Sequence, residues 1–409
     1  MVTKAKGTTQ WIINPHRVNE VDENGPAAML HPHIIRPARK LVESIDNYEP
    51  TPLVKLENLA AYWGLDRVYV KDESKRFGLN AFKVLGGIYA VANVICQKLG
   101  VDVKDMTYQQ LVSKEVKEKV GDLLFVTATD GNHGRGIAWA ARQLGQKSVV
   151  FMPKGSSQHR LKMIQDEGAE ASITELNYDD AVRHANEYAE LHSGIMVQDT
   201  AWEGYEEIPV WIMQGYAVLM DEVKELLEVE DELPPTHVFL QAGVGSFAGG
   251  VQGYLAQAWK ENRPKTVVLE PDEADCYYRT ALIDDGKPHA VTGHMETIMA
   301  GLACGEPNEI GWKILRAYAS AFVSCPDELA ARGMRILAAP LPGDPQVVSG
   351  ESGAIGAGFL AELMTKDSMK PLREKLSINA TSRVLIISTE GDTDPEQYRK
   401  IVWEGEYPS

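Results

Sequence analysis

The amino-acid sequence predicts an α/β protein with two three-layer domains, each built on a mostly parallel β-sheet. From about residue 121 onward, short β-branched runs alternate with amphipathic helical segments, which is the pattern of parallel α/β units rather than of a β-sandwich. The chain of 409 residues also exceeds the size at which one hydrophobic core usually stops growing. Hydrophobic residues make up 44% and charged residues 24%, so we expect a packed core in each domain.

The first series of predicted elements lies in the first half of the chain. The strands in LLFVTAT (123–129) and KSVVFMP (147–153) each lead into a helical segment, and MVQDT (196–200) continues the pattern. These alternating strands and helices indicate one α/β block.

The second series begins after the acidic, proline-containing stretch VEDELPP (229–235). Its strands are predicted in THVFLQAG (236–243), KTVVLEP (265–271) and SRVLIIST (382–389), which indicates a second sheet. Residues 1–50 show weak periodicity and are expected to pack as loops and short helices.

Charge and composition exclude several classes of protein. The formal net charge of -17 and the pI of about 5.1 disfavour a nucleic-acid partner, because no basic cluster offsets the repulsion from phosphates. No run of about 18 apolar residues occurs, and the N-terminal segment lacks the apolar core of a signal peptide. We therefore expect a cytoplasmic protein without a membrane partner.

The four cysteines do not form a recognisable framework. Cys96, Cys276, Cys304 and Cys325 are too scattered for a disulfide scaffold or a zinc site, so no metal is expected and free thiols are the prediction. Cys276 and Cys304 lie in a loop-rich stretch, and their pairing stays open at this point.

A lysine at a predicted helix start is the first candidate functional residue. In AFKVLGG (81–87), Lys83 follows Phe82 and opens an apolar helical segment. A lysine amine attacks an aldehyde when desolvation or a nearby positive charge lowers its pKa, and this position could supply both. On this motif alone, an ordinary solvated surface lysine is far more often the explanation.

Two glycine-rich segments follow predicted strands. In TATDGNHGRG (127–136), the glycines permit tight turning, and the helix start offers free amides to an anion, although Thr129 and Asp130 could simply cap the helix. In QAGVGSFAGG (241–250), backbone amides of Gly243, Val244, Gly245, Ser246 and Phe247 could wrap a phosphate. The glycine spacing there does not satisfy the dinucleotide pattern, although Glu270 stands about where a ribose contact would.

Two further segments carry polar candidates. ISTEGDTD (387–394) is a strand end in which Ser388 or Thr389 could hydrogen-bond a ring nitrogen. SGESGAIGAG (349–358) begins a small-residue helix at Glu351, where a simple helix N-terminal acid is the alternative interpretation.

Taken in this order, the four motifs resemble the fold type II pyridoxal-phosphate enzymes. The resemblance runs from TPLVKLENL at about residue 51 to about residue 394. Within that group the chain most resembles the diaminopropionate ammonia-lyases, because Asp130 stands before Gly131, Asn132 and His133, where serine and threonine dehydratases typically carry a serine. Asp199, in VQDT, resembles a second acidic position of the lyases, and a turn former is the alternative.

The resemblance implies a role for each candidate residue. Lys83 would be the Schiff-base lysine, Phe82 would flank the cofactor ring, and Asn132 would contact the phenolic oxygen. The 243–247 loop would hold the phosphate. Ser388, or else Thr389, would meet the pyridine nitrogen, and Glu351 would stand near the cofactor. The substrate would be bound by Thr129, Asp130, Gly131, Asn132, His133 and Asp199.

The resemblance also implies the reaction. The expected activity is α,β-elimination of D- and L-2,3-diaminopropionate to pyruvate and ammonia, with Lys83, Asp130 and Asp199 as catalytic residues. The alternatives are a serine or threonine dehydratase or another β-elimination or β-replacement enzyme of the same group, and a dehydrogenase or non-catalytic binding protein on a similar sheet. The family architecture implies a large domain of residues 1–89 and 206–409, a small mobile domain of residues 90–205, and a homodimer.

Overall fold

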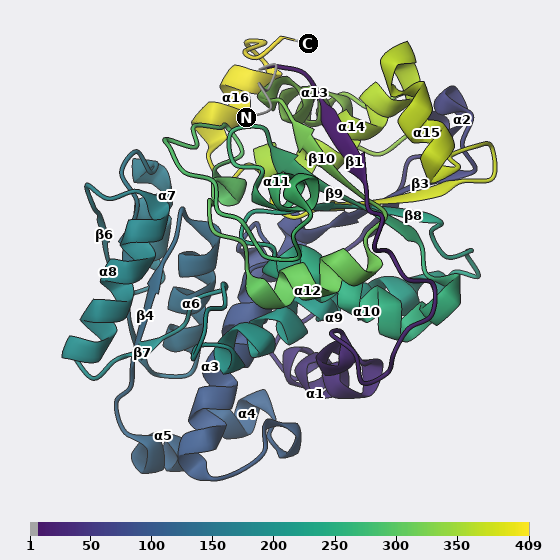
Figure 1. The fold of residues 1–409 in the computed structure, drawn as a ribbon. Helices are drawn as coiled ribbons and strands as arrows, with labels where there is room; N and C mark the ends of the chain where they lie inside the picture. Colours follow the sequence, from purple (N-terminus) through teal and green to yellow (C-terminus); the bar gives the residue numbers. More distant parts are fainter. Residues whose placement is uncertain (1–6, 409) are drawn as a thin grey trace.

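Two β-sheets organise the chain in the computed structural model, which describes residues 7–408 (Figure 1). The larger sheet has the strand order β1-β10-β9-β8-β11-β3-β2, and the smaller has the order β6-β5-β4-β7. All neighbouring strands run parallel except β1, which is antiparallel to β10, and β2, which is antiparallel to β3. The predicted fold class of two mostly parallel sheets covered by helices is confirmed.

The strands of the larger sheet come from both ends of the chain. They are β1 (Gln10–Ile13), β2 (Leu53–Lys55), β3 (Arg67–Asp72), β8 (His237–Gln241), β9 (Lys265–Pro271), β10 (Ala321–Cys325) and β11 (Arg383–Ser388). The central strands β8 and β11 are apolar on both faces because helices cover the sheet on either side, as expected for a parallel sheet.

One helical layer of the larger sheet packs around α9 and α10, and the opposite layer around α13 and α14 (Figure 1). The first layer contains α1 (Pro32–Glu43), α3 (Val84–Leu99), α9 (Glu207–Val229), α10 (Ser246–Trp259) and α12 (Glu309–Tyr318). The second contains α2 (Glu57–Trp63), α13 (Asp327–Ala338), α14 (Glu351–Thr365), α15 (Lys370–Leu376) and α16 (Pro395–Val402). Helix α11 (Cys276–Ile283) packs beside β9 and β10.

The smaller sheet is also covered on both faces. Its strands are β4 (Leu124–Ala128), β5 (Lys147–Met152), β6 (Glu170–Ile173) and β7 (Ile195–Met196). Helix α8 (Tyr178–Leu191) covers one face, and α6 (Asn132–Gln143) with α7 (Gln158–Asp166) covers the other. Two short helices, α4 (Tyr108–Leu111) and α5 (Lys114–Val120), precede β4. This unit lies inside the predicted 90–205 segment, and the exact domain boundaries stay a prediction.

Several strands and helices depart from the sequence prediction. The strands β1, β2, β3, β6 and β10 were not predicted. The expectation of loops and short helices for residues 1–50 is wrong for β1 and for the three-turn helix α1; residues 1–6 lie outside the described residues. Within residues 7–408, no helix is long and apolar enough to span a membrane.

The carboxyl ends of the parallel strands meet where the two sheets face each other. The segments after β4, β7, β8 and β11 all end in polar or glycine-rich turns. Since ligands of open α/β sheets bind outside these strand ends, the fold places the predicted motifs at one location.

Candidate active site

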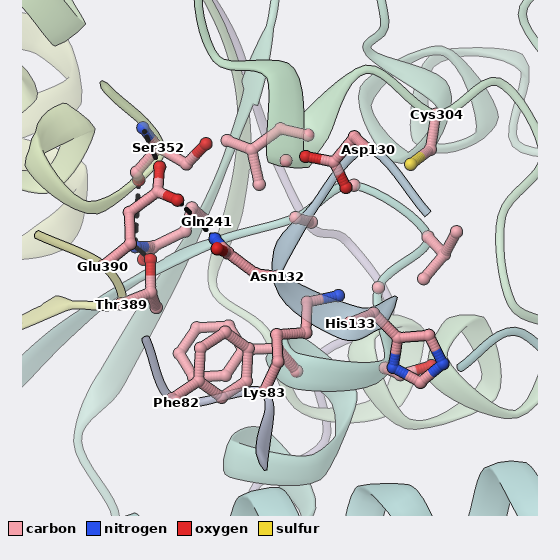
Figure 2. A pocket seen from close by; sticks show the side chains of 18 of the residues that line it. Phe82, Lys83, Asp130, Asn132, His133, Gln241, Cys304, Ser352, Thr389 and Glu390 are labelled. Carbon is pink, nitrogen blue, oxygen red and sulfur yellow. Dashed lines mark hydrogen bonds between the residues drawn. The ribbon is translucent and has the colours of Figure 1, made fainter. Parts of the chain in front are cut away.

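Lys83 stands at the start of α3 on a backbone that is fixed by the segment after β11. Ala81 pairs with Glu390, and the Phe82 N–H donates to the carbonyl oxygen of Thr389 at 3.1 Å. The ring of Phe82 packs against the rings of Tyr216 and Phe247, with 4.7 Å between centroids in each pair. The amine of Lys83 therefore projects from a rigid base into a pocket (Figure 2).

Asp199 pairs with Lys83 at the floor of this pocket. The Lys83 amine donates to Oδ2 of Asp199, and the Tyr216 hydroxyl donates to the same oxygen at 3.2 Å. Burial opposes both charges, but neighbouring groups outweigh it: His133 and Lys83 lower the pKa of Asp199 to about 2, and Asp199 holds the pKa of Lys83 above its ordinary value. The predicted lowering of the Lys83 pKa is therefore wrong for the protein without cofactor, because Asp199 more than offsets desolvation.

His133 adds a neutral ring beside this pair. Its Nε2 lies 2.8 Å from the carbonyl oxygen of Val197 and therefore donates to it. Burial lowers the pKa of His133, which keeps the ring uncharged. The unprotonated Nδ1 is buried without a hydrogen-bond partner, 3.8 Å from Oδ2 of Asp199. The pocket thus holds an unused acceptor beside the carboxylate that binds Lys83.

The segment between β4 and α6 forms the wall that faces Lys83. Thr129 Oγ1 accepts from the Gly131 N–H at 2.9 Å, which fixes the turn, and no side chain caps α6. The first-turn amides of α6 therefore stay open to an anion, and the alternative of a simple cap is not seen. Asp130 lies across the pocket from Lys83, and its Oδ2 is buried without a hydrogen-bond partner (Figure 2).

The loop from Gly243 to Phe247 requires glycine at its centre. Gly245 has a φ of +92°, and a Cβ there would overlap the Tyr277 hydroxyl. The carbonyl of Val244 accepts from the Tyr277 hydroxyl and from the Asn308 N–H, each at 2.8 Å. These contacts hold the Val244 carbonyl on the side of the loop away from the pocket. The backbone amides of the loop and of the first turn of α10 can therefore face the pocket.

The side-chain hydroxyl of Ser246 forms its hydrogen bonds with other residues of the protein. Its hydroxyl donates to the backbone carbonyl of Asp199 and accepts from Asn308 Nδ2 at 2.6 Å. The glycine-rich loop is thereby bound to the segment that carries Asp199, although the two lie far apart in the sequence.

The segment after β11 places Thr389, rather than Ser388, on the pocket wall. Thr389 Oγ1 accepts from Gln241 Nε2 at 2.9 Å, whereas the Ser388 hydroxyl donates to Ser349 Oγ at 2.8 Å and lies outside the pocket lining. A neutral hydroxyl at the pocket wall is available for a ring nitrogen at Thr389.

Glu390 was missed by the sequence analysis and connects two walls of the pocket. Its Oε2 accepts from Asn132 Nδ2, and its Oε1 accepts from the Ser352 N–H at 3.1 Å. Glu351 does not line this pocket, although the next residue, Ser352, does. It lies in the adjoining opening, 4.0 Å from the Arg160 guanidinium, so its placement does not support contact with a cofactor.

The pocket, with about 610 Å³ of space free of protein atoms and partly open to solvent, brings most predicted residues together. Those that line it are Phe82, Lys83, Asp130, Asn132, His133, Gly243, Val244, Gly245, Ser246, Phe247 and Thr389. Thr129, Gly131 and Asp199 lie behind this lining and shape it. Tyr178, Gln241, Cys304 and Ser352 also line it and were not predicted. Gln241 and Ser352 stand in segments that the sequence analysis singled out for other residues, whereas Tyr178 and Cys304 belong to no motif. All four cysteines are free and buried, as expected.

The sequence matches a family model described as pyridoxal-phosphate dependent enzyme over residues 45–373. The diaminopropionate ammonia-lyase of Salmonella typhimurium is 55% identical over 89% of this chain and 90% of its own length. That of Escherichia coli K12 is 52% identical over 90% and 91% of the two chains. The crystal structure of the Escherichia coli enzyme in complex with D-serine superposes with a TM-score of 0.91, at 46% identity, over 98% and 99% of the chains. A chain with this pocket and these relatives belongs to the diaminopropionate ammonia-lyases, a branch of the pyridoxal-phosphate dependent enzymes.

Proposed function

We propose that this protein eliminates the β-amino group of 2,3-diaminopropionate, converting one substrate and one water into pyruvate and two molecules of ammonia. The observation that carries the proposal is the placement of two carboxylates at the reactive end of the pocket. Asp199 is bound to the Lys83 amine, and Asp130 faces that amine with an Oδ2 that accepts no hydrogen bond and lies 3.5 Å from the Arg160 guanidinium. Such a site suits a substrate with two ammonium groups, since buried charges need partners.

The residues of the pocket fit pyridoxal phosphate. A phosphate dianion requires a cradle of amides, and this loop can form one only with glycine at position 245, where φ is +92° and a Cβ would overlap the Tyr277 hydroxyl behind the loop. Lys83 supplies the amine for the aldehyde, Asn132 supplies an amide for the phenolic oxygen, and Thr389 supplies a neutral hydroxyl for the ring nitrogen. Ser352 Oγ is buried beside the same wall without a partner, which indicates a polar ligand there.

Bound pyridoxal phosphate acts as an electron sink for the carbanion that forms when the α-proton leaves. Lys83 Nζ is placed to remove that proton from one face of the substrate, and Asp130 Oδ2 from the opposite face. The same arrangement supports activity on both enantiomers.

Departure of the β-amine needs an acid, and Lys83 is the nearest one. Once Lys83 Nζ has taken up the α-proton, the resulting ammonium, paired with Asp199, can deliver that proton to the leaving nitrogen and become an amine again. His133, neutral and tied to the Val197 carbonyl, orients the Asp199 side of the pocket without adding charge. Water then hydrolyses the unsaturated amine to pyruvate and the second ammonia.

The further features of the proposal concern the whole chain. We propose a large domain of residues 1–89 and 206–409, a small domain of residues 90–205 that closes over the substrate, a homodimer, and a cytoplasmic location. The resemblance to the family supports these features. Light scattering of the purified protein tests the dimer, and a monomer would contradict it.

Pyruvate release tests the proposed function directly. The protein loaded with pyridoxal phosphate is given D- and L-2,3-diaminopropionate beside D- and L-serine and threonine, and Lys83→Ala serves as the inactive control. We expect the diamines to be preferred. A preference for serine or threonine would contradict the proposal and make the enzyme a dehydratase.

A further inference from the structure

Arg160 lies in the mouth of the active-site pocket, between the two sheets. It belongs to the first turn of α7, which packs with the smaller sheet, and only 9% of its side chain is exposed. Its stem passes close to the turn before α6, because a Cβ at Gly131 would stand 3.0 Å from Cδ of Arg160. The guanidinium is therefore held against the segment that carries Asp130.

The guanidinium also contacts two segments that pack on the larger sheet. Nη2 donates to Thr393 Oγ1 at 3.4 Å, and the same nitrogen lies 4.0 Å from Oε2 of Glu351 at the start of α14. Burial opposes the charge of Arg160, but the surrounding carboxylates Glu390, Asp130 and Glu351 outweigh it, so its pKa is raised. These contacts fix the position of the cation with respect to both sides of the pocket.

The contact of Arg160 with Asp130 has an unusual geometry for an ion pair. Nη1 lies 3.5 Å from Oδ2 of Asp130, and that oxygen is buried without a hydrogen bond. Within residues 7–408, Arg160 is the one ion-pair partner of Asp130. At this distance the guanidinium stabilises the carboxylate charge without occupying the lone pairs that a base needs.

We propose that Arg160 is a positioning residue that keeps the Asp130 carboxylate directed into the pocket, and so sets the rate for the one enantiomer whose α-proton Asp130 removes. The proposal rests on the proposed function. It differs from binding of the substrate carboxylate by Arg160, since that role would serve both enantiomers alike. A purely structural role would also affect both alike.

The ratio of kcat/KM for D- and L-2,3-diaminopropionate tests the proposal. Asp130→Asn shows which enantiomer depends on Asp130. Arg160→Met keeps the apolar stem without the charge, and it should change the ratio in the same direction by roughly tenfold or more, through kcat, because misplacing a reacting group by about 1 Å can cost on the order of 100-fold. Arg160→Lys should bring the ratio part of the way back to that of the wild type, because it restores the positive charge but not the planar set of donors of a guanidinium.

The matched control is Arg142→Met. Arg142 pairs with Glu167 at the end of α7, is half exposed, and does not line the pocket. It should leave the ratio unchanged. In the double variant Asp130→Asn with Arg160→Met, the ratio should equal that of Asp130→Asn alone, because the base that Arg160 positions is gone.

A second measurement does not depend on activity. In cofactor-free protein, Arg160→Met should lower the midpoint of thermal unfolding, because it leaves several buried carboxylates without their shared cation. Adding Asp130→Asn should recover part of that loss. Equal effects of Asp130→Asn with and without Arg160 would overturn the proposed coupling.

The outcomes separate the two proposals. If the wild type releases no pyruvate from either enantiomer of the diamine, the proposed function fails, and the unfolding measurement still decides whether Arg160 and Asp130 are coupled. If the wild type is active but Arg160→Met lowers kcat/KM equally for both enantiomers, or raises KM for both, the proposed role of Arg160 is wrong. The proposed function is unaffected by that result. If Arg160→Met does not fold, Arg160→Lys decides, with a smaller change of the ratio in the same direction expected and no change overturning the proposal.

Discussion

The carboxylate of Asp199 is buried with Tyr216 and accepts hydrogen bonds from the Tyr216 hydroxyl and from the partly exposed Lys83 amine. Burial alone would lower the pKa of Lys83, and Asp199 reverses that effect. Asp199→Asn should therefore let burial lower the pKa. Because the amine must be unprotonated to attack an aldehyde, cofactor-free Asp199→Asn should combine with pyridoxal phosphate at lower pH than the wild type does. The rate at which visible absorbance develops, followed across a pH series, measures this.

Asp199→Glu is the control for this prediction, because it keeps the charge and should keep the pH profile closer to that of the wild type. An Asp199→Asn profile that coincides with the wild-type profile would show that Asp199 does not set the charge of Lys83.

Residues that stand in motifs could be predicted, whereas those that act through distant contacts could not. Lys83, Asn132 and the 243–247 loop each occupy a strand end or a helix start, so local pattern identified them. The sign of the Lys83 pKa shift was missed because its partner Asp199 lies 116 residues away. Arg160 has the appearance of any basic residue in an amphipathic helix, and only the fold places it beside Asp130.

Helices α3, α6 and α9 cross closely around Lys83 through glycines. A Cβ at Gly136 in α6 would stand 3.0 Å from the Val84 nitrogen at the start of α3. Gly136→Ala should therefore push α6 away from Lys83 and destabilise the protein by about 1–3 kcal/mol through overpacking. We also expect weaker binding of pyridoxal phosphate per folded molecule, measured by titration of the visible absorbance beside thermal unfolding.

Gly356→Ala provides the comparison at the same scale. Its Cβ would meet the Ile386 side chain at 2.9 Å, between α14 and β11, and Gly356 does not line the pocket. It should affect stability with little effect on cofactor affinity. Equal loss of cofactor affinity in both variants would contradict the importance of the crossing of α3 and α6.

Helix α14 begins with Glu351, whose carboxyl group is buried near Glu390. Burial, together with Glu390, raises the pKa of Glu351 to about 7, although Arg160 opposes the shift. A folded-state pKa above the unfolded value of about 4.3 means that the protein loses stability as pH rises between these values. Glu351→Gln removes that loss, so its unfolding midpoint relative to the wild type should increase from about pH 5 to about pH 8. A difference that stays constant over this range would rule out ionisation of Glu351 as its cause.

Elements with a strong pattern were predicted, and elements defined by their neighbours were not. The apolar runs of β8, β9 and β11 specify buried parallel strands in any context. By contrast, the edge strands β1 and β2 are short, half-buried and antiparallel to their neighbours, so they depend on β10 and β3 for their hydrogen bonds. Sequence periodicity contains no information about such a partner.

The strand order of the larger sheet also could not be predicted from the sequence. Alternating strands and helices predicted the fold class, but β3 lies next to β11 although more than 300 residues separate them. That neighbouring pair brings the Lys83 segment beside Thr389 and Glu390 and so completes the pocket. The resemblance to a known family implied that Lys83 and Ser388 or Thr389 meet the same cofactor, which spacing along the chain could not, but the strand order itself was not predicted.

A buried ion network connects β3 and the segment after it to α9. Its centre is Glu222, about two helical turns after Tyr216. Oε2 of Glu222 accepts from Lys71 at 2.6 Å and from Arg76 at 2.7 Å, and both cations are almost fully buried. Burial opposes the charge of Glu222, but Arg76 and Lys71 outweigh it and hold its pKa at about 2. The network fixes the segment that leads from β3 to Lys83.

Glu222→Gln leaves two buried cations short of a partner and should destabilise the protein by about 3–5 kcal/mol at neutral pH. Because the folded pKa of Glu222 lies below the unfolded value, the wild type keeps this stabilisation above about pH 4.3 and loses it as pH falls toward about 2. The variant and the wild type should therefore converge in acid, as measured by denaturant unfolding at several pH values. Glu225→Gln, one turn along α9 at a mostly exposed carboxylate that pairs with Arg39, should change stability by less than about 1 kcal/mol. If Glu222→Gln differed from the wild type by the same amount at every pH, the charge of Glu222 would not be what stabilises the junction of β3 and α9.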